Sequence, residues 1–414
     1  MAPSRDLDVI VLGASGVTGK QAVPYLRGRA ADLGFRWGIA GRNRDRLEAL
    51  LDGWPEDERP EVFVVDTERR ESVDAAVARA RAIVNFAGPF ARMAPPVIES
   101  CVEAGIGYVD VTGEIDFAAR IVERFHGPAE QSGARIVQVC GFEALPFDLP
   151  AALAMERLES AHGEPPAEVD AIFAGTPPPG RPYASDLVSN GTFESLREAM
   201  EGDGASLLGD PAALIGDLAD PKRIRTACPI RSRPRWKEGV GPLAPMIPSP
   251  VINPPVIQRT LALTGRPPLL YREAVAAESM VPTRPLQAVL AGSVSALNGG
   301  LTLLTRAPAG VRRAGTSAMK ALAPSGGPRE DRLEGWHWSV ETTARGASGA
   351  EALARVVGEG HPGYLATSRM TAEAGLILAD ADADKPDRAG VLTPASALGT
   401  AELDRFEAAG VRFS

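Results

Sequence analysis

Short apolar runs alternate with helical patterns along the first part of the chain. The runs predict six strands, each rich in Val or Ile and followed by a turn, at residues 9–12, 36–40, 62–65, 82–86, 108–111 and 135–139. Between them, apolar residues at helical spacing predict helices over residues 20–31, 44–51, 70–80, 95–104 and 116–131. This alternation predicts an α/β fold with a doubly wound parallel sheet of the Rossmann type.

The pattern changes near residue 150, where the alternation of strand and helix stops. Proline-rich loops at 175–180 and 242–255 then separate longer strands, and alternating large and polar residues over 335–342 predict a half-exposed antiparallel strand. A helical run over 363–379 and a last helix near 397–409 follow. We therefore expect a Rossmann domain over residues 1–149, a mixed α+β second domain over 150–375, and a C-terminal segment, 376–414, that returns to the first domain.

The most apolar long window covers residues 286–304. It contains Gln287, Ser293, Ser295 and Asn298 together with several glycines, so it is a poor candidate for a membrane-spanning helix. We favour a helix buried in the protein over a surface that touches lipid or an apolar substrate. Peripheral contact with a membrane stays open as the second interpretation.

The totals describe a folded protein of two lobes with an acidic net charge. The chain has 414 residues, more than one hydrophobic core usually serves, and 44% of them are hydrophobic. A net charge of -9 argues against a nucleic-acid surface, because phosphate backbones are bound by clustered Lys and Arg. The basic run that starts at residues 222–225 is better explained as a solvated loop than as a site for an anionic ligand.

The cysteines and the first residues indicate the compartment. Cys101, Cys140 and Cys228 are widely spaced and odd in number, which fits a reducing compartment without a disulfide framework. The N-terminal residues lead into a strand without the apolar stretch of a signal peptide. We expect a cytoplasmic protein, and because no His, Cys or Asp cluster has ligand spacing, we expect no metal site.

A glycine-rich turn follows the first strand and opens the first helix. Gly13, Gly16 and Gly19 have the spacing GxxGxxG, which in this strand–turn–helix context is typical of dinucleotide binding. The first glycine permits the turn, the second lets a pyrophosphate approach backbone N–H groups, and the third lets helix and strand pack closely. We predict that the phosphates are bound by Gly13, Ala14, Ser15, Gly16, Val17, Thr18 and Gly19.

The end of the second strand distinguishes NAD from NADP. An acidic residue at this place would accept a hydrogen bond from the ribose 2′-hydroxyl, but the chain has Gly41, Arg42, Asn43 and Arg44. A guanidinium attracts the dianionic 2′-phosphate and can hold it through charge-assisted hydrogen bonds. We therefore predict NADP as the cofactor and Arg42 as the residue that selects it.

Three further segments follow strands at the edge where ligands bind in such sheets. Asp66 is suited to accept from the adenine amino group and equally suited to cap the next helix. The residues Phe86, Ala87, Gly88 and Pro89 form a small turn beside the expected dinucleotide, where Gly88 permits close approach. Gly113 and Glu114 follow the fifth strand at the expected nicotinamide end, although helix capping explains Glu114 nearly as well.

The chain resembles the saccharopine dehydrogenase-like oxidoreductases, and within them the trans-acting enoyl reductases of actinobacterial lipid and polyketide assembly. The most specific segments are YVDVTGE at 108–114 and CGFEALPFDL at 140–149. Residues 11–19, 40–42, 85–90, 363–367 and 390–395 extend the resemblance along the chain. It implies an NADP(H)-binding domain interrupted by a mixed α+β substrate domain, with the final residues packing back on the first.

Candidate catalytic residues lie in the second domain, over residues 181–192. This segment resembles the family's Ser-x-Gly-Thr segment, and Ser189 and Thr192 flank a glycine that permits close approach of a ligand. Hydride transfer to an enoyl thioester needs a hydrogen-bond donor for the enolate oxygen and a proton for the α-carbon. We predict Ser189 and Thr192 as donors and Tyr183 as proton donor, while a helix cap with its turn explains the serine and threonine equally well.

These features together predict an NADPH-dependent oxidoreductase. The resemblance implies that it reduces a carbon–carbon double bond of a lipid, polyketide or other natural-product intermediate, a small-molecule and apolar substrate. One alternative is a saccharopine-type amino-acid dehydrogenase, in which Arg225, Arg231 and Arg233 clamp carboxylates. The other is a non-catalytic NADP(H)-binding or lipid-associated protein.

Overall fold

A computed structural model of the chain describes residues 5–180, 197, 200–246, 252–320 and 328–414. Contacts within the chain divide it into two compact units. The first unit comprises Met1–Thr112, Arg120–Leu145 and Pro362–Val411, and the second comprises Gly113–Ala119, Pro146–His361 and Arg412–Ser414. The chain thus re-enters the first unit at Pro362, whereas the sequence pattern places that return at residue 376.

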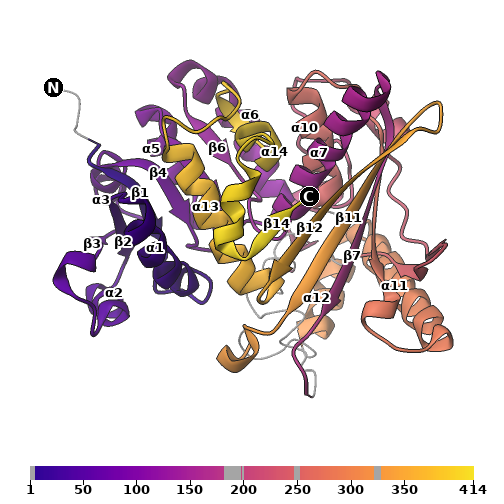
Figure 1. Cartoon of the computed structure of the whole chain (residues 1–414), viewed down its shortest axis with the longest axis horizontal. Coiled ribbons are helices and arrows are strands. Elements are labelled where there is room, and N and C mark those ends of the chain that lie inside the picture. Colours follow the sequence, from indigo (N-terminus) through magenta and orange to yellow (C-terminus); the bar gives the residue numbers. More distant parts are fainter. Residues whose placement is uncertain (1–4, 181–196, 198–199, 247–251, 321–327) are drawn as a thin grey trace. The chain divides into compact units, whose positions relative to one another are not determined.

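The first unit is built on a seven-stranded parallel sheet with the order β13-β6-β5-β4-β1-β2-β3 (Figure 1). Its strands are β1 (Leu7–Leu12), β2 (Trp37–Gly41), β3 (Glu61–Val64), β4 (Ala80–Asn85), β5 (Gly107–Asp110), β6 (Arg135–Val137) and β13 (Gly390–Leu392). Six of them are the predicted strands, and the predicted doubly wound sheet is confirmed. Strands β1, β2 and β4 are buried almost throughout, which explains why they read as continuous apolar runs.

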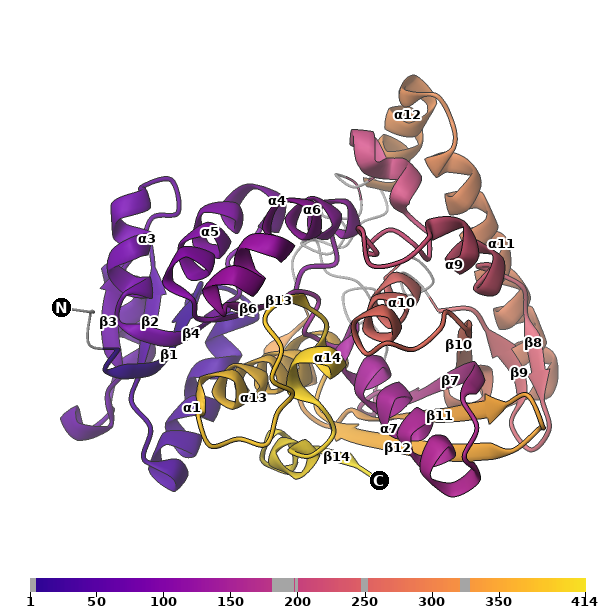
Figure 2. The same ribbon diagram turned by 90° about the horizontal axis from the view of Figure 1, so that it is seen from above.

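Helices cover both faces of this sheet. Helices α3 and α5 lie on one face with α6, and α1 lies with α13 on the other (Figure 2). The helices of this unit are α1 (Gly19–Leu33), α2 (Arg44–Glu48), α3 (Arg70–Val77), α4 (Phe90–Met93), α5 (Pro95–Ala104), α6 (Ile115–Ser132, shared with the second unit), α13 (Thr367–Ala379) and α14 (Pro394–Leu398). Short helical turns are η1 (Ala49–Leu51), η2 (Glu56–Glu58), η8 (Pro362–Ala366) and η9 (Leu403–Ala409).

One correction concerns the end of the chain, where a single helix over 397–409 is predicted. The structure instead has α14 and then the 3-10 helix η9. Gly399 between them has φ +67 and ψ -164, a backbone conformation that glycine adopts readily and that ends the helix.

Helix α13 returns from the C-terminal part of the chain and packs directly on β4 and β5. A Cβ atom at Gly375 would lie 2.3 Å from Cγ2 of Val84, so only a glycine permits this approach. On its other side the fully buried carboxylate of Glu373 accepts hydrogen bonds from Tyr25, Arg29 and Arg405 at 2.6 to 3.1 Å. Glu373 therefore joins α1, α13 and η9 through a buried ion-pair network.

The second unit contains a mixed seven-stranded sheet with the order β14-β12-β11-β7-β10-β9-β8. Strands β7 and β10 are parallel, while β11 pairs antiparallel with both β7 and β12. The strands are β7 (Pro166–Thr176), β8 (Arg235–Lys237), β9 (Gly241–Ala244), β10 (Leu270–Ala276), β11 (His337–Gly346), β12 (Glu351–Glu359) and β14 (Val411–Phe413). The predicted mixed α+β character of this part is confirmed, and its predicted strand over 335–342 falls in β11.

Two helices of the second unit differ sharply in burial. The helices are α7 (Leu145–His162), α9 (Pro221–Ala227), α10 (Asn253–Leu263), α11 (Arg284–Thr305) and α12 (Ala309–Lys320), with short turns η4 (Asp203–Leu207), η6 (Ala277–Ser279) and η7 (Glu330–Arg332). Helix α10 packs on β10 and is buried over most of its length. Helix α11 lies beside β9, and the prediction of a buried helix over 286–304 is wrong, because it buries only Gln287, Ala291 and Asn298.

Replacing Glu373 by Gln tests how far the returning helix depends on the buried ion-pair network. The amide keeps the side-chain volume but leaves Arg29 without the carboxylate it pairs with, while Arg405 keeps Asp380 at 2.8 Å. Since breaking a buried ion pair is strongly destabilising, we expect a loss of about 3 kcal/mol in the stability of the first unit. Scanning calorimetry should show a lower Tm. Glu407→Gln, an exposed change on η9, is the matched control and should leave the Tm unchanged; equal Tm values for both variants would contradict the assigned role.

Candidate functional site

The glycine turn connects β1 to α1 at the carboxyl edge of the first sheet. Gly13 has φ +79, and a Cβ atom there would lie 2.7 Å from the backbone nitrogen of Ala87. A Cβ atom at Gly19 would lie 2.2 Å from the carbonyl oxygen of Gly13, whereas at Gly16 it would meet only that oxygen, at 3.1 Å. Gly13 and Gly19 are therefore required by packing, and Gly16 is the glycine that leaves room for a ligand.

The outer surface of this turn fits a pyrophosphate. Ser15, Gly16 and Val17 are exposed, and Val17 retains 54% of its accessible surface. The first turn of α1 contains no acidic side chain, and Thr18 makes no side-chain cap. Exposed N–H groups at the positive end of a 15-residue helix attract anionic oxygens.

Arg42 follows β2 with an exposed and unengaged side chain. In the described part of the chain its guanidinium makes no ion pair or hydrogen bond, whereas Arg44 pairs with Glu48 at 3.1 Å. Asn43 caps the next helix by accepting from the N–H of Arg46 at 3.0 Å. The neighbours of Arg42 thus have structural partners, and Arg42 has the charge and freedom that a 2′-phosphate requires.

Asp66 has a structural role that the sequence leaves open. One carboxylate oxygen accepts from the N–H of Glu68 at 3.1 Å, and the backbone N–H and C=O of Asp66 both bond to the hydroxyl of Ser72. These contacts organise the start of α3. The second carboxylate oxygen is the atom that the predicted contact with the adenine amino group would use.

A buried polar network that the sequence analysis missed lies under the loop after β4. The Asn85 amide donates to the hydroxyl of Tyr108 at 2.9 Å, and that hydroxyl donates to Asp110 at 2.9 Å. The Asn85 carbonyl oxygen accepts from the N–H of Ala87 at 2.9 Å. Burial, reinforced by the charge of Asp110, holds the pKa of Tyr108 well above its usual value, so the phenol stays a donor.

This network fixes the predicted loop of Phe86, Ala87, Gly88 and Pro89. Phe86 is buried, Ala87 is held by Asn85, and Gly88 and Pro89 are exposed. Since Ala87 also lies against Gly13, the loop and the glycine turn are in direct contact. The exposed pair is placed to meet a dinucleotide that follows the turn.

Asp110 also holds the loop that follows β6. Its Oδ1 atom accepts from the N–H groups of Thr112 and Val139 at 3.1 and 3.3 Å, and its backbone oxygen accepts from Cys140 at 2.8 Å. Val139 has φ +57, a strained conformation for a β-branched residue. Strain of this kind persists where several contacts define the backbone, and it often marks a functional edge.

The segment after Cys140 is fixed by residues from the C-terminal part of the chain. Thr371 donates to the carbonyl oxygen of Cys140 at 2.9 Å, and the hydroxyl of Thr367 accepts from the N–H of Phe142 at 3.0 Å. A Cβ atom at Gly141 would lie 3.0 Å from Cγ2 of Thr367. Two segments that carry the family resemblance, 140–149 and 363–367, therefore meet in the structure.

Gly113 and Glu114, predicted to lie at the nicotinamide end, belong by their contacts to the second unit. A Cβ atom at Gly113 would lie 3.3 Å from Cδ1 of Ile252. Glu114 is buried, and its carbonyl oxygen accepts from the N–H of Ala118 at the start of α6. Their contribution to a cofactor site stays a prediction.

The predicted catalytic residues Tyr183, Ser189 and Thr192 lie outside the described residues. Elsewhere in the second unit, buried polar side chains form two close sets that the sequence did not indicate. Thr260 donates to Asp148 at 2.6 Å, and Glu273 accepts from Tyr271 at 2.9 Å and from Asn253 at 2.8 Å. Asp148 belongs to the family segment 140–149, and this membership was the only feature of the sequence that could have drawn attention to these polar side chains.

The three arginines suggested as carboxylate clamps differ in their contacts within the protein. Arg225 forms an ion pair with Asp210 at 2.7 Å, so its guanidinium already has a carboxylate. Arg231 and Arg233 are exposed in the loop before β8. One of the three suggested clamps is thus occupied within the protein itself.

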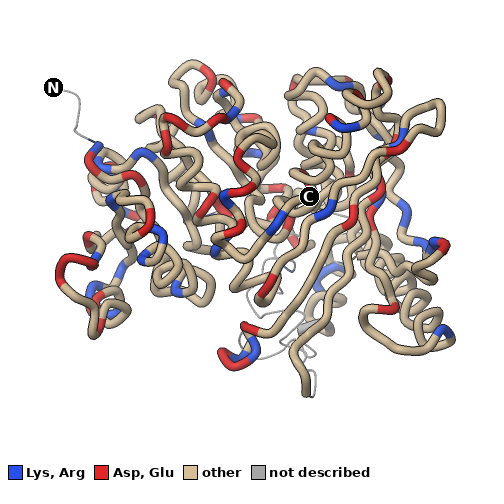
Figure 3. Tube along the Cα trace, in the orientation of Figure 1, with Lys and Arg blue, Asp and Glu red and all other residues tan. Residues whose placement is uncertain are grey.

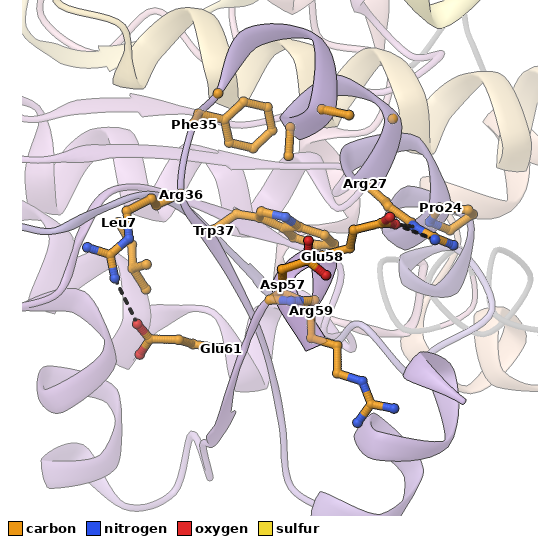
Figure 4. Close-up of a pocket in the computed structure, with 15 residues that line it drawn as sticks. Leu7, Pro24, Arg27, Phe35, Arg36, Trp37, Asp57, Glu58, Arg59 and Glu61 are labelled. Carbon is orange, nitrogen blue, oxygen red and sulfur yellow. Dashed lines mark hydrogen bonds and ion pairs between the residues drawn. The ribbon is translucent and has the colours of Figure 1, made fainter. Parts of the chain in front are cut away.

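A hollow of about 600 Å³ on the first unit lies at the wrong edge for the cofactor (Figure 4). Leu7, Trp37 and Glu61, which begin β1, β2 and β3, line it. The glycine turn and Arg42 follow the opposite ends of these strands. Among the described residues, no cluster of three His, Cys, Asp or Glu side chains is arranged to hold a metal ion.

The sequence is similar to a known family over the region that forms this site and beyond it. Residues 9–137 match the family model described as the saccharopine dehydrogenase NADP binding domain. A Mycobacterium tuberculosis protein provisionally named a trans-acting enoyl reductase is 32% identical over 99% of this chain and 97% of its own length. The trans-acting enoyl reductase of Mycobacterium ulcerans is 28% identical over 98% of this chain and 97% of its own.

Among solved structures, apo saccharopine dehydrogenase (L-Glu forming) from Saccharomyces cerevisiae is similar over 94% of both chains, with a TM-score of 0.48 and 12% identity. The sequence relatives cover the whole length, and the matched NADP-binding domain contains the glycine turn, Arg42 and the Asn85 network. The chain therefore belongs to the family of saccharopine dehydrogenase-like trans-acting enoyl reductases and is an NADP-dependent oxidoreductase.

Proposed function

We propose that this protein uses NADPH to reduce a carbon–carbon double bond in an enoyl thioester of lipid, polyketide or related natural-product assembly. The observation that carries the cofactor assignment is the exposed glycine turn together with the unengaged Arg42. The reaction is supported by relatives that are named trans-acting enoyl reductases and that are similar to this chain over 97% of their length. We also propose an apolar small-molecule substrate and a cytoplasmic location.

NADPH supplies the hydride for this reduction. In our proposal the N–H groups of Ser15 and Val17 bind the pyrophosphate, while the N–H of Gly16 donates to the carbonyl oxygen of Gly13 at 2.9 Å and shapes the turn. Arg42 pairs with the 2′-phosphate. The Asn85 network positions Gly88 and Pro89 alongside. Tyr183 would deliver the proton to the α-carbon, and Ser189 and Thr192 would donate hydrogen bonds to the developing enolate oxygen.

Turnover with defined substrates tests the reaction itself. The purified protein should oxidise NADPH in the presence of enoyl thioesters and not in the presence of imino or keto acids, as followed by absorbance and product mass. Tyr183→Phe should lower kcat by about a hundredfold or more while leaving NADPH affinity intact, because only the proton donor is lost. Turnover of amino-acid precursors alone would favour a saccharopine-type dehydrogenase, and NADPH binding without any turnover would favour a non-catalytic protein.

Gly16→Val tests phosphate binding at the glycine turn. A Cβ atom at this position would lie 3.1 Å from the carbonyl oxygen of Gly13, which a shift of a few tenths of an ångström relieves, so the variant should stay folded. The added side chain should keep the pyrophosphate from the backbone and weaken NADPH binding by at least about tenfold. Calorimetric titration measures the Kd. Gly28→Ala in the helix that follows the turn, where a Cβ atom meets nothing within 4 Å, should bind NADPH normally; an unchanged Kd for Gly16→Val would remove the turn from the site.

Arg42→Ala tests cofactor choice. Loss of charge-assisted hydrogen bonds to the 2′-phosphate should cost about 1.5–3 kcal/mol, which raises the KM for NADPH roughly tenfold to a hundredfold. The KM for NADH should not rise, because NADH lacks that phosphate. Arg44→Ala is the control, since its guanidinium is paired with Glu48; an equal effect from both variants would show that the charge of the whole turn, rather than Arg42, selects NADP.

A further inference from the structure

Helix α11 buries two amide side chains and exposes several of its large apolar residues. The side that faces the second unit carries Gln287 and Asn298, both buried. Leu286, Val289 and Leu297 are 52%, 64% and 55% exposed, and their spacing places them on one face of the helix. Leu303, two residues before the end of α11, is 72% exposed. This arrangement is the reverse of a helix that packs on a soluble core.

Hydrogen bonds fix the orientation of this helix. The amide of Gln287 donates to the carbonyl oxygen of Val281 at 3.1 Å, and its own oxygen accepts from Arg284 at 3.1 Å. The amide of Asn298 donates to the carbonyl oxygen of Met246 at 3.2 Å. Rotating α11 to bury its apolar side would break the bond from Asn298 to Met246 and leave a buried amide unsatisfied, so the present orientation is favoured.

The same bonds decide between spanning a membrane and lying on one. Within the described residues, α11 is the helix that has the length and apolarity to cross a bilayer. Its polar side, however, is bonded within the second unit and packs beside β9. A helix held in this way can place its outer face in the interface plane of a bilayer while the rest of the unit stays in water.

The charge around α11 is of the sign that anionic lipids attract. Between Ser279 and Arg329 the sequence contains no Asp or Glu, although the whole chain has a net charge of -9. Apart from Arg284 at its first position, α11 contains no charged residue, as its tan trace in Figure 3 indicates, and Arg306 and Arg313 follow it with exposed side chains. Glu278 lies 4.0 Å from Arg284, and Glu201 pairs with Arg197 at 3.0 Å and also interacts with the charge of Arg313.

An exposed tryptophan extends the apolar face beyond the helix. Trp236 on β8 is 69% exposed, and the guanidinium of Arg284, at the start of α11, lies 5.6 Å from the centre of its ring. Figure 2 shows β8 and β9 beside α11. Tryptophan with arginine is the pair that favours the boundary between headgroups and acyl chains.

We propose that this protein docks reversibly on anionic membranes through the α11 face, formed by Trp236, Leu286, Val289, Leu297 and Leu303. The apolar side chains enter the acyl boundary, and Arg306 and Arg313 meet lipid phosphates. The proposal does not depend on the reaction catalysed. It places the protein at a bilayer surface, where long-chain substrates concentrate.

Vesicle sedimentation tests the proposal with the full chain. The protein should bind phosphatidylcholine vesicles that contain phosphatidylglycerol, and the triple variant Leu286→Ser, Val289→Ser, Leu297→Ser should lower the partition coefficient by about a hundredfold. The control is a triple variant at exposed apolar positions elsewhere, Leu33→Ser, Val64→Ser and Leu353→Ser, which should bind like the parent protein. NADPH affinity in solution should be unchanged in both, which separates this test from that of the proposed function.

The arginines give a second and independent readout. Arg306→Gln with Arg313→Gln should weaken binding to anionic vesicles about fivefold for each arginine and leave binding to pure phosphatidylcholine unchanged. Equal binding by the α11-face and control variants would overturn the proposal. Self-association that the α11-face variant abolishes, with no vesicle binding by the parent, would assign the face to a second copy of the chain and would overturn it as well.

Discussion

The carboxylate of Asp110 is the constraint on which the cofactor edge of the first unit depends. Through Tyr108 it orients Asn85 and the loop after β4, and through its other oxygen it holds the N–H groups of Thr112 and Val139. A buried carboxylate needs such donors, because burying it unpaired would cost several kcal/mol. The requirement works in both directions: the loops satisfy the charge, and the charge holds the loops in one geometry, which a site for a flexible dinucleotide needs.

Helix α13 completes this edge from far along the sequence. Its first half carries Thr367 and Thr371, which bond the segment after β6, and its second half carries Glu373 and Gly375, which dock it on α1 and β4. The chain leaves the first unit after residue 145, so the sheet face beside α1 is covered only when α13 returns. Docking and loop positioning are thus combined in one helix, and the NADP-binding unit is complete only with the C-terminal segment.

Periodicity was sufficient to predict the strands of the first sheet, because strands buried on both faces are continuous apolar runs. It was not sufficient for the Asp110 network, whose members are spread over two strands and meet only across the sheet. It predicted a helix at α11 but wrongly placed that helix in the core. The average apolarity of a segment does not tell which of its residues, such as Gln287 and Asn298, are buried. Tyr183, Ser189 and Thr192 stay predictions from sequence resemblance, since they lie outside the described residues.

The glycine turn and α11 share one physical property: each exposes groups that contacts within the folded chain do not cover. At the turn, Ser15, Gly16 and Val17 are exposed, and among the described residues Arg42 has no counter-charge while Arg44 pairs with Glu48. On α11, Leu286, Leu297 and Leu303 are exposed while the amides of Gln287 and Asn298 are buried. Exposed donors and exposed apolar faces of this kind mark surfaces that bind a ligand or a partner. The glycine turn suits phosphates, whereas the α11 face suits acyl chains beside phosphate headgroups. Because the two surfaces belong to separate compact units, each can be altered without disturbing the residues that form the other.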